Sequence, residues 1–230
     1  RRFRYPFLTC TQCGPRFSLI TDIPYDRANT TMNRFQLCRD CRAEYEDHMN
    51  RRFHAEPIAC PVCGPRLALW DVQGQVVARE QGALQQACEN IRGGRILAVK
   101  GVGGFQLWVD ARSDAAVQQL RRRKTRPDKP FAVLFPSVHA VREACLLTPE
   151  EAALLLSPGA PIVLLRQREQ SGLARSVSPD NPFVGAMVPY SPLHYLLMTE
   201  LQGPTVATSG NRSDEPIVID EQEALVRLAG

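Results

Sequence analysis

The chain has 230 residues, of which 44% are apolar and 23% are charged, values typical of a soluble globular protein. Its formal net charge of +4 at pH 7 is too small for a wholesale nucleic-acid coat, although local basic patches are compatible with it. Because the sequence has no long apolar run and no visible signal peptide, we expect a cytoplasmic protein without a membrane span. The chain opens on Arg1 rather than Met and closes on Gly230, so we expect a fragment of a longer polypeptide.

Cysteines concentrate near the start of the chain, where six of the eight form Cys-x-x-Cys pairs. The pairs are Cys10/Cys13, Cys38/Cys41 and Cys60/Cys63. Between Cys41 and Cys60 lie 18 residues, which gives the last two pairs the spacing of a four-thiolate zinc site. Four thiolates leave no open position on the metal for water, so we expect a structural zinc ion. His48 and His54 lie between these pairs, but the four cysteines already complete the ligand set.

A short repeat relates two of the pairs, because both Cys13 and Cys63 are followed by Gly-Pro-Arg. We therefore expect residues 1–68 to form a tandem four-cysteine zinc-finger module. In this interpretation Cys10 and Cys13 also bind metal, in a first finger whose other knuckle precedes the chain. Disulfide bonds are the alternative, and the missing secretion signal disfavours them. The two remaining cysteines, Cys88 and Cys145, are expected in the core.

Helical and apolar segments alternate from residue 69 to residue 230, which indicates a second domain. We expect helices over 82–92 and 191–200, and after the capping residues Ser113, Thr148 and Asp220. We expect strands at 95–100, 105–110, 131–135, 161–165 and 204–208, and we expect the third and fourth of these to be buried. The alternation predicts an α/β fold with a twisted, mostly mixed sheet.

The segment 121–130, RRRKTRPDKP, carries six cations between a helix end and the apolar run 131–135. A strand is fixed by its packing, so charges beside it are held at one edge of a rigid sheet. Concentrated positive charge at such an edge suits a phosphate-bearing ligand. The alternative is a solvated helix end, where cations face the negative end of the helix dipole.

Three turns could add groups to a phosphate site. The segment 100–105, KGVGGF, places a lysine beside a glycine-rich turn that can direct backbone amides at an anion, but it lacks the Walker and dinucleotide patterns. The segment 208–213, TSGNRS, ends a strand with hydroxyls, an amide and a cation, and could equally be an ordinary polar turn. The segment 184–194 could form a ligand wall or a passage from core to loop.

Taken in order, these features resemble the hydrogenase-maturation carbamoyltransferases of the HypF type. The cysteine spacing matches that family's paired zinc fingers from the second knuckle onward. The segments KGVGGF, RRRKTRPDKPFAVL, VGAMVPYSPLHYLL and TSGNRSDEP resemble its YrdC-like domain. The resemblance covers nearly the whole chain and implies a YrdC-like α/β (α+β) fold with a twisted mixed sheet. The family also has an acylphosphatase-like domain before the fingers and a Kae-type domain afterwards, and we expect neither here.

The resemblance implies an enzyme that cleaves carbamoyl phosphate and uses ATP, with Mg²⁺, to form carbamoyl adenylate. It also implies that the carbamoyl group passes to the terminal cysteine of a HypE-type partner. Fixed cations and donors are needed where charge builds on the phosphate oxygens. The expected catalytic residues are Lys100, Arg123, Lys129, Ser209 and Asn211. The expected nucleotide-binding residues are Lys124, Arg126, Thr208, Gly210 and Arg212.

Two other functions compete with this one. A threonylcarbamoyl-adenylate synthase, which acts in tRNA modification, would share the YrdC-like segments, but zinc fingers are not part of that family's usual pattern. A zinc-ribbon protein that binds RNA would suit the basic run. We regard nucleic-acid binding as unlikely, because the net charge is small and aromatic residues do not interleave with the basic residues.

Overall fold

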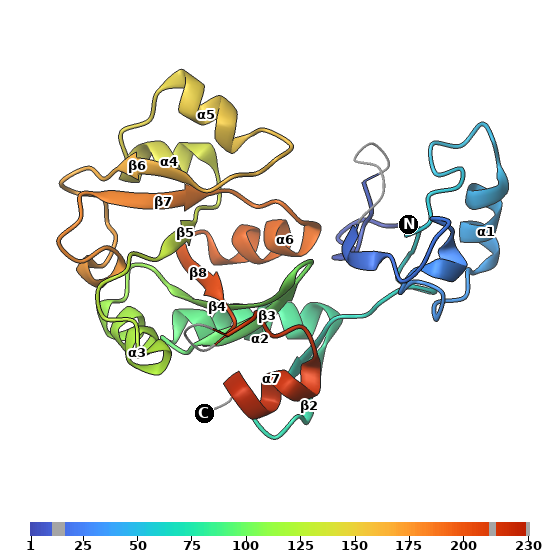
Figure 1. Cartoon of the computed structure of the whole chain (residues 1–230), viewed down its shortest axis with the longest axis horizontal. Helices are drawn as coiled ribbons and strands as arrows, with labels where there is room; N and C mark the ends of the chain where they lie inside the picture. The colour runs from blue at the N-terminus through green and yellow to red at the C-terminus, as the bar shows by residue number, and fades with distance from the viewer. Residues whose placement is uncertain (11–16, 212–214, 229–230) are drawn as a thin grey trace. The chain divides into compact units, whose positions relative to one another are not determined.

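The computed structural model describes residues 1–10, 17–211 and 215–228, and the chain divides into two compact units (Figure 1). The first unit is Arg1–Leu67 and the second is Ala68–Gly230. The described part of the first unit contains the short helices η1 (Phe17–Leu19), η2 (Arg27–Asn29) and α1 (Arg39–Glu46). Its small core has two clusters, one of Tyr5, Met32 and Ala59 and one of Cys41, Ile58 and Cys60.

The second unit is built on a six-stranded sheet with the order β3-β4-β8-β5-β7-β6. Its strands are β3 (Leu97–Gly101), β4 (Gly104–Asp110), β5 (Ala132–Leu134), β6 (Val163–Arg166), β7 (Phe183–Met187) and β8 (Thr205–Ser209). Only β5 and β7 run parallel, and every other neighbouring pair in this sheet is antiparallel. The mixed sheet expected from the sequence is therefore confirmed. A separate hairpin joins β1 (Ala68–Trp70) to β2 (Val76–Arg79).

The second unit also contains helices, and several of them begin at capping residues. The helices are α2 (Glu80–Arg92), α3 (Asp114–Lys124), α4 (Val138–Ala144), α5 (Pro149–Leu155), η3 (Arg175–Val177), α6 (Pro192–Leu201) and α7 (Glu221–Leu228). The Ser113 side chain accepts a hydrogen bond at the start of α3, and Thr148 with Glu151 forms a capping box on α5. None of the helices formed by the described residues is long and apolar enough to cross a bilayer.

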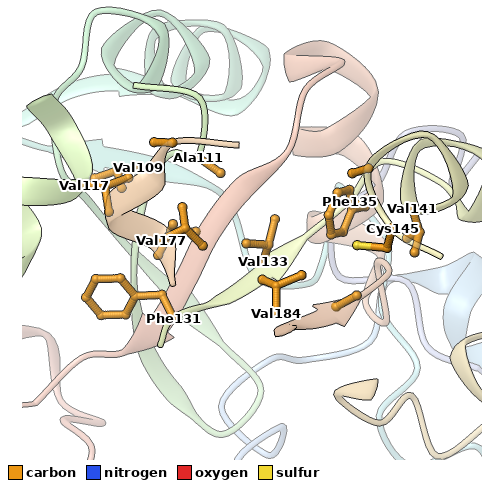
Figure 2. Close-up of a cluster of buried hydrophobic side chains, with 14 of the residues drawn as sticks. Val109, Ala111, Val117, Phe131, Val133, Phe135, Val141, Cys145, Val177 and Val184 are labelled. Atoms are coloured by element: carbon orange, nitrogen blue, oxygen red, sulfur yellow. The ribbon is translucent and has the colours of Figure 1, made fainter. Parts of the chain in front are cut away.

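The main core lies on one face of the sheet (Figure 2). Val109, Val206, Val133 and Ala186 occupy directly paired positions on four neighbouring strands, and all four are fully buried. Residues of α3, including Val117, belong to the same cluster. Directly paired residues of neighbouring strands share a face, so odd-numbered positions of β4 point toward this core and even-numbered positions point to the other face. On that other face Trp108 contacts His194 of α6.

The structure corrects the expected burial of one strand and shows a strand that we did not expect. We expected residues 161–165 to form a buried strand, but β6 is the last strand of the sheet, and its Leu164 is 71% exposed. An apolar run cannot tell a strand with two covered faces from an edge strand with one. The start of the segment 184–194 forms β7, which pairs with β5 and β6 inside the sheet. Cys88 and Cys145 are buried as expected.

Candidate functional site

Four cysteines of the first unit converge on one point. The Sγ atoms of Cys38, Cys41, Cys60 and Cys63 all lie within 4.8 Å of one another. Cys38 and Cys60 are 3.8 Å apart at sulfur, and Cys60 and Cys63 are 3.7 Å apart. A tetrahedral zinc ion with sulfur ligands at about 2.3 Å requires sulfur–sulfur distances of about 3.8 Å. The donors therefore fit a structural zinc ion, and in the described part of the chain histidine takes no part in the cluster.

Local structure prepares these thiols for a metal. Cys38 precedes the first residue of α1, and Cys41 lies in the first turn of that helix. Burial opposes ionisation of the Cys60 thiol, but hydrogen bonds from the backbone amides of Cys63 and Val62 lower its pKa to about 7. A low thiol pKa favours the thiolate that zinc binds, whereas burial raises the pKa of the neighbouring Cys41 thiol, which must lose its proton when the metal binds.

A guanidinium group that sequence analysis missed lies against the cluster. The Arg2 side chain is only 8% exposed and donates to the Sγ atom of Cys41 at 3.2 Å. It also donates to the carbonyl oxygen of Ala59 at 2.7 Å and pairs with Glu44 at 2.7 Å. Positive charge at this position offsets the charge of four thiolates. Spacing rules point to ligands only, so the sequence carried no signal for this contact.

The expected first finger is less completely described. Cys10 is exposed, and Cys13 lies outside the described residues. Metal binding by this pair therefore stays a prediction.

In the second unit, four chain segments meet at one end of the sheet. Gln106, near the start of β4, pairs with Ser209 at the end of β8, and Lys100, near the end of β3, pairs with Phe105. β5 runs antiparallel to β8, so the residues that precede β5 lie at this same end. The basic segment 121–130 leads directly into β5. The sheet therefore brings the basic run and the end of β8 together.

Lys124 makes the central contact at this end. Its Nζ atom donates to the carbonyl oxygens of Ser209 at 2.6 Å and Asn211 at 2.9 Å, and to Oδ1 of Asn211 at 3.1 Å. Ser209 Oγ donates to the same Oδ1 atom at 2.6 Å. Burial, with a smaller contribution from nearby Arg126, lowers the pKa of Lys124 to about 8. A buried ammonium group thus organises the turn that follows β8.

The backbone between Lys124 and Arg126 adopts an unusual conformation. Thr125 ends α3 in the left-handed region, with φ 49° and ψ 45°. A β-branched residue rarely takes this conformation, and strain of this kind is typical of residues that position a site. The bend allows Arg126 to reach β8 as well, where it donates to the Thr208 hydroxyl at 3.4 Å. Lys124 and Arg126 therefore act together on the end of one strand.

Arg121 belongs to the same basic run but has a structural role. It is 7% exposed, and its guanidinium donates to the carbonyl oxygens of Arg126, Pro127 and Lys129 at 2.9–3.2 Å. It also donates to carbonyl oxygens of η3, and it lies over the Phe131 ring. These contacts hold the loop 126–130 in place. Sequence analysis counted Arg121 as one cation among six, because charge alone does not reveal burial.

Other expected site residues are placed differently. Lys100 forms an ion pair with Glu221 of α7 at 2.6 Å and lies over the Phe105 ring. Arg123 and Lys129 have exposed side chains. Arg212 lies outside the described residues. The structure thus joins Lys124 and Arg126 to the β8 end, whereas Lys100 contacts α7.

The glycines at this end are needed for close chain packing. A Cβ atom on Gly210 would lie 2.8 Å from the Phe105 carbonyl oxygen, to which the Gly210 amide donates. Gly104 has φ 129°, and a Cβ there would lie 2.6 Å from the Ile217 side chain. From the sequence, the glycine-rich turn is a place where an anion could approach the backbone. In the structure, the protein's own segment around Ile217 lies close to Gly104 instead.

A cluster of Trp108, Tyr190 and His194 lies on the face of the sheet opposite the main core. Trp108 donates from its indole nitrogen to Gln106 Oε1 at 3.1 Å, and Gln106 Nε2 donates to the Tyr190 hydroxyl at 2.7 Å. The His194 ring is fully buried, with its centroid 4.4 Å from that of Tyr190 and 5.2 Å from that of Trp108. Burial lowers the pKa of His194 to about 4, so the ring is neutral at physiological pH. Sequence analysis did not foresee this group, because its members come from distant segments.

Comparison with known proteins places this geometry in a family. Residues 89–230 match the Sua5–YciO–YrdC family, described as telomere recombination, and residues 1–20 and 37–70 match the HypF finger. The chain is 50% identical over 228 residues to the carbamoyltransferase HypF of Synechocystis and 47% identical over 229 residues to that of Rhodobacter capsulatus. These alignments cover 99% and 100% of this chain but only 30% of each relative.

A solved structure agrees along the same length. The crystal structure of full-length HypF in the phosphate- and nucleotide-bound form matches with a TM-score of 0.89 and 47% identity. The match covers 99% of this chain and 30% of that one. The HypF finger and these whole-chain similarities confirm the resemblance inferred from the sequence, and the chain belongs to the Sua5–YciO–YrdC family.

Proposed function

We propose that this chain carries the adenylation step of a HypF-type carbamoyltransferase, with ATP, Mg²⁺ and carbamoyl phosphate as reactants. The observation that carries the proposal is the junction at the end of β8, where Lys124 contacts Ser209 and Asn211 and Arg126 contacts Thr208. A nucleotide-bound relative of high similarity supports it. The chain spans about 30% of that relative, so the activity of the whole enzyme is itself part of the proposal.

The reaction requires positive charge near the phosphate groups of ATP. Water hydrolyses carbamoyl phosphate to carbamate and phosphate, and a carbamate oxygen then attacks the α-phosphorus of ATP while pyrophosphate leaves. Negative charge builds on the phosphate oxygens, which fixed cations stabilise. Arg126 lies at the β8 end, and Lys129 lies on a loop that Arg121 holds rigid. These two side chains are suited to the triphosphate, and the exposed Arg123 and Lys100, which pairs with Glu221, are further candidates for it.

Lys124 has a different part in this proposal. Its hydrogen bonds hold the carbonyl groups of Ser209 and Asn211 together with the Oδ1 atom of Asn211, which also accepts from Ser209 Oγ. The Asn211 amide nitrogen uses one hydrogen for the Glu215 carbonyl oxygen, so its second hydrogen can be donated to the α-phosphate or the carbamoyl group beside Ser209. Thr208 and Gly210 shape the same turn. The carbamoyl group then passes from AMP to the thiol of an acceptor of the HypE type. A zinc ion held by the four cysteines would have a structural role in this scheme.

ATP–pyrophosphate exchange in the full-length polypeptide tests the proposal. Exchange that depends on carbamoyl phosphate is the expected result, and we expect Asn211→Ala and Lys129→Ala to weaken ATP binding. Arg142→Ala, which removes an exposed cation of α4, is the matched control and keeps normal binding. Exchange that instead depends on threonine and bicarbonate would indicate a threonylcarbamoyl-adenylate synthase. Unchanged ATP affinity in both site variants would refute the site assignment.

A further inference from the structure

Three side chains on the α6 face of the sheet form a hydrogen-bond chain with a fixed direction. The Trp108 indole can only donate, so the amide oxygen of Gln106 must accept from it. This leaves the amide nitrogen of Gln106 to donate to the Tyr190 oxygen. The Tyr190 hydroxyl hydrogen is consequently not used in this chain and can be donated to another acceptor.

The open end of this chain lies beside the proposed site. Gln106 pairs directly with Ser209 across β4 and β8, and directly paired antiparallel residues point to the same face. The Tyr190 hydroxyl therefore lies 2.7 Å from the amide of the residue that pairs directly with Ser209. Tyr190 is 40% exposed, whereas Trp108 is fully buried. The chain thus runs from the core toward solvent and ends in a donor.

The support beneath Tyr190 is rigid and uncharged. The His194 ring meets the Tyr190 ring nearly at a right angle, at 86°, and also packs against Trp108. Within the part of the chain that the structure describes, neither nitrogen of His194 has a hydrogen-bond partner. Buried polar atoms are rarely left unpaired, and where they are, a functional constraint is one explanation. Here the neutral ring fixes the orientation of the tyrosine without adding charge.

A neutral donor suits a different part of the substrate from the cations. Phosphate oxygens carry the charge that Arg126 and Lys129 can meet, whereas a phenolic hydroxyl matches an oxygen of low charge. We propose that the Tyr190 hydroxyl, oriented by Trp108 and Gln106, donates to the carbonyl oxygen of the carbamoyl group held beside Ser209. The inference rests on the proposed function. During adenylation one carbamate oxygen bonds to phosphorus, and the hydrogen bond from Tyr190 holds the other oxygen.

Tyr190→Phe tests this by removing the hydroxyl alone. In the full-length polypeptide we expect carbamoyl-phosphate-dependent exchange to fall roughly tenfold in kcat/KM, the effect of one lost hydrogen bond, while ATP affinity by calorimetry is unchanged. Tyr195→Phe is the matched control, because Tyr195 lies on α6, which begins two residues after Tyr190, and is 58% exposed. It should show wild-type exchange.

Gln106→Met tests the orienting chain. If Gln106 acts through Tyr190, the double variant Gln106→Met/Tyr190→Phe should lose no more exchange than Tyr190→Phe alone. Additive losses would contradict the chain. Wild-type exchange in Tyr190→Phe, or an equal loss of ATP affinity, would overturn the inference alone. Absence of exchange in the wild-type protein would instead refute the proposed function, and the inference with it.

Discussion

The four-cysteine cluster of Arg1–Leu67 and the Lys124 junction of Ala68–Gly230 are assembled in opposite ways. Each half of the cysteine cluster is a local Cys-x-x-Cys turn, so most of its geometry is written into short segments. At the junction, Lys124 contacts residues 85 and 87 positions away, which only a complete sheet brings near. A zinc ion held by the four thiolates would stabilise the cysteine cluster, whereas satisfied hydrogen bonds stabilise the junction. Variants should therefore fail differently in the two regions.

Cys38→Ser should have the largest effect. Structural zinc contributes on the order of 10 kcal/mol to the folding of zinc-finger peptides, and one lost thiolate weakens the site strongly. We expect bound zinc to fall sharply, as measured by elemental analysis after dialysis, with loss of order in Arg1–Leu67. Cys88→Ala removes a buried thiol of the other unit and should keep its zinc. Full zinc retention by Cys38→Ser would show that these four cysteines do not form the site.

Lys124→Met tests the hydrogen bonds of the junction in the second unit. Removal of the ammonium group leaves the carbonyls of Ser209 and Asn211 without their donor in a buried site. Because each orphaned group costs about 1–3 kcal/mol, we expect the free energy of unfolding to fall by about 4 kcal/mol. Lys129→Ala, in the same run but exposed, should leave this free energy unchanged. Chemical denaturation measures both, and equal losses would mean that burial does not separate the two lysines.

A smaller effect is expected for His194, and it depends on pH. Burial lowers the pKa of His194 from 6.5 to about 4. Between these two pH values the imidazole is protonated in the unfolded chain but neutral in the folded chain. The free energy of unfolding should therefore decrease as the pH falls from 6.5 to 4, by roughly 3 kcal/mol for this group. His194→Phe should remove this dependence.

The free energy of unfolding can be measured at each pH by tryptophan fluorescence during chemical denaturation. The signal reports on the second unit, because Trp70 and Trp108 both belong to it. His139→Gln is the control: its imidazole is 80% exposed, so the variant should keep the wild-type slope. The same slope in His194→Phe would mean that the ring is not held neutral by burial.

The cysteine spacing was sufficient to select the four thiols that converge, and capping residues placed the starts of α3, α5 and α7. They did not place α2, which begins at Glu80 without a side-chain cap, or α4, which was not expected. The basic run was expected at an edge of the sheet, but it leads into β5, which has a neighbouring strand on each side, and so lies at one end of the inner strands. The different roles of its residues were not expected from the sequence. Arg121 and Lys124 are buried, whereas Arg123 and Lys129 are exposed. Identical charges one or two positions apart differ only in what the rest of the fold packs against them.

What the sequence by itself determined are the features that short-range chemistry controls: ligand spacing, helix caps, strand-forming runs and the resemblance carried by four segments. Only the tertiary structure decided that β6 is an edge strand, that Lys100 pairs with α7, and that Trp108, Gln106 and Tyr190 form one chain. The physical reason is that strand order and register bring together residues distant in sequence, and burial then gives each polar group its partner and its charge state.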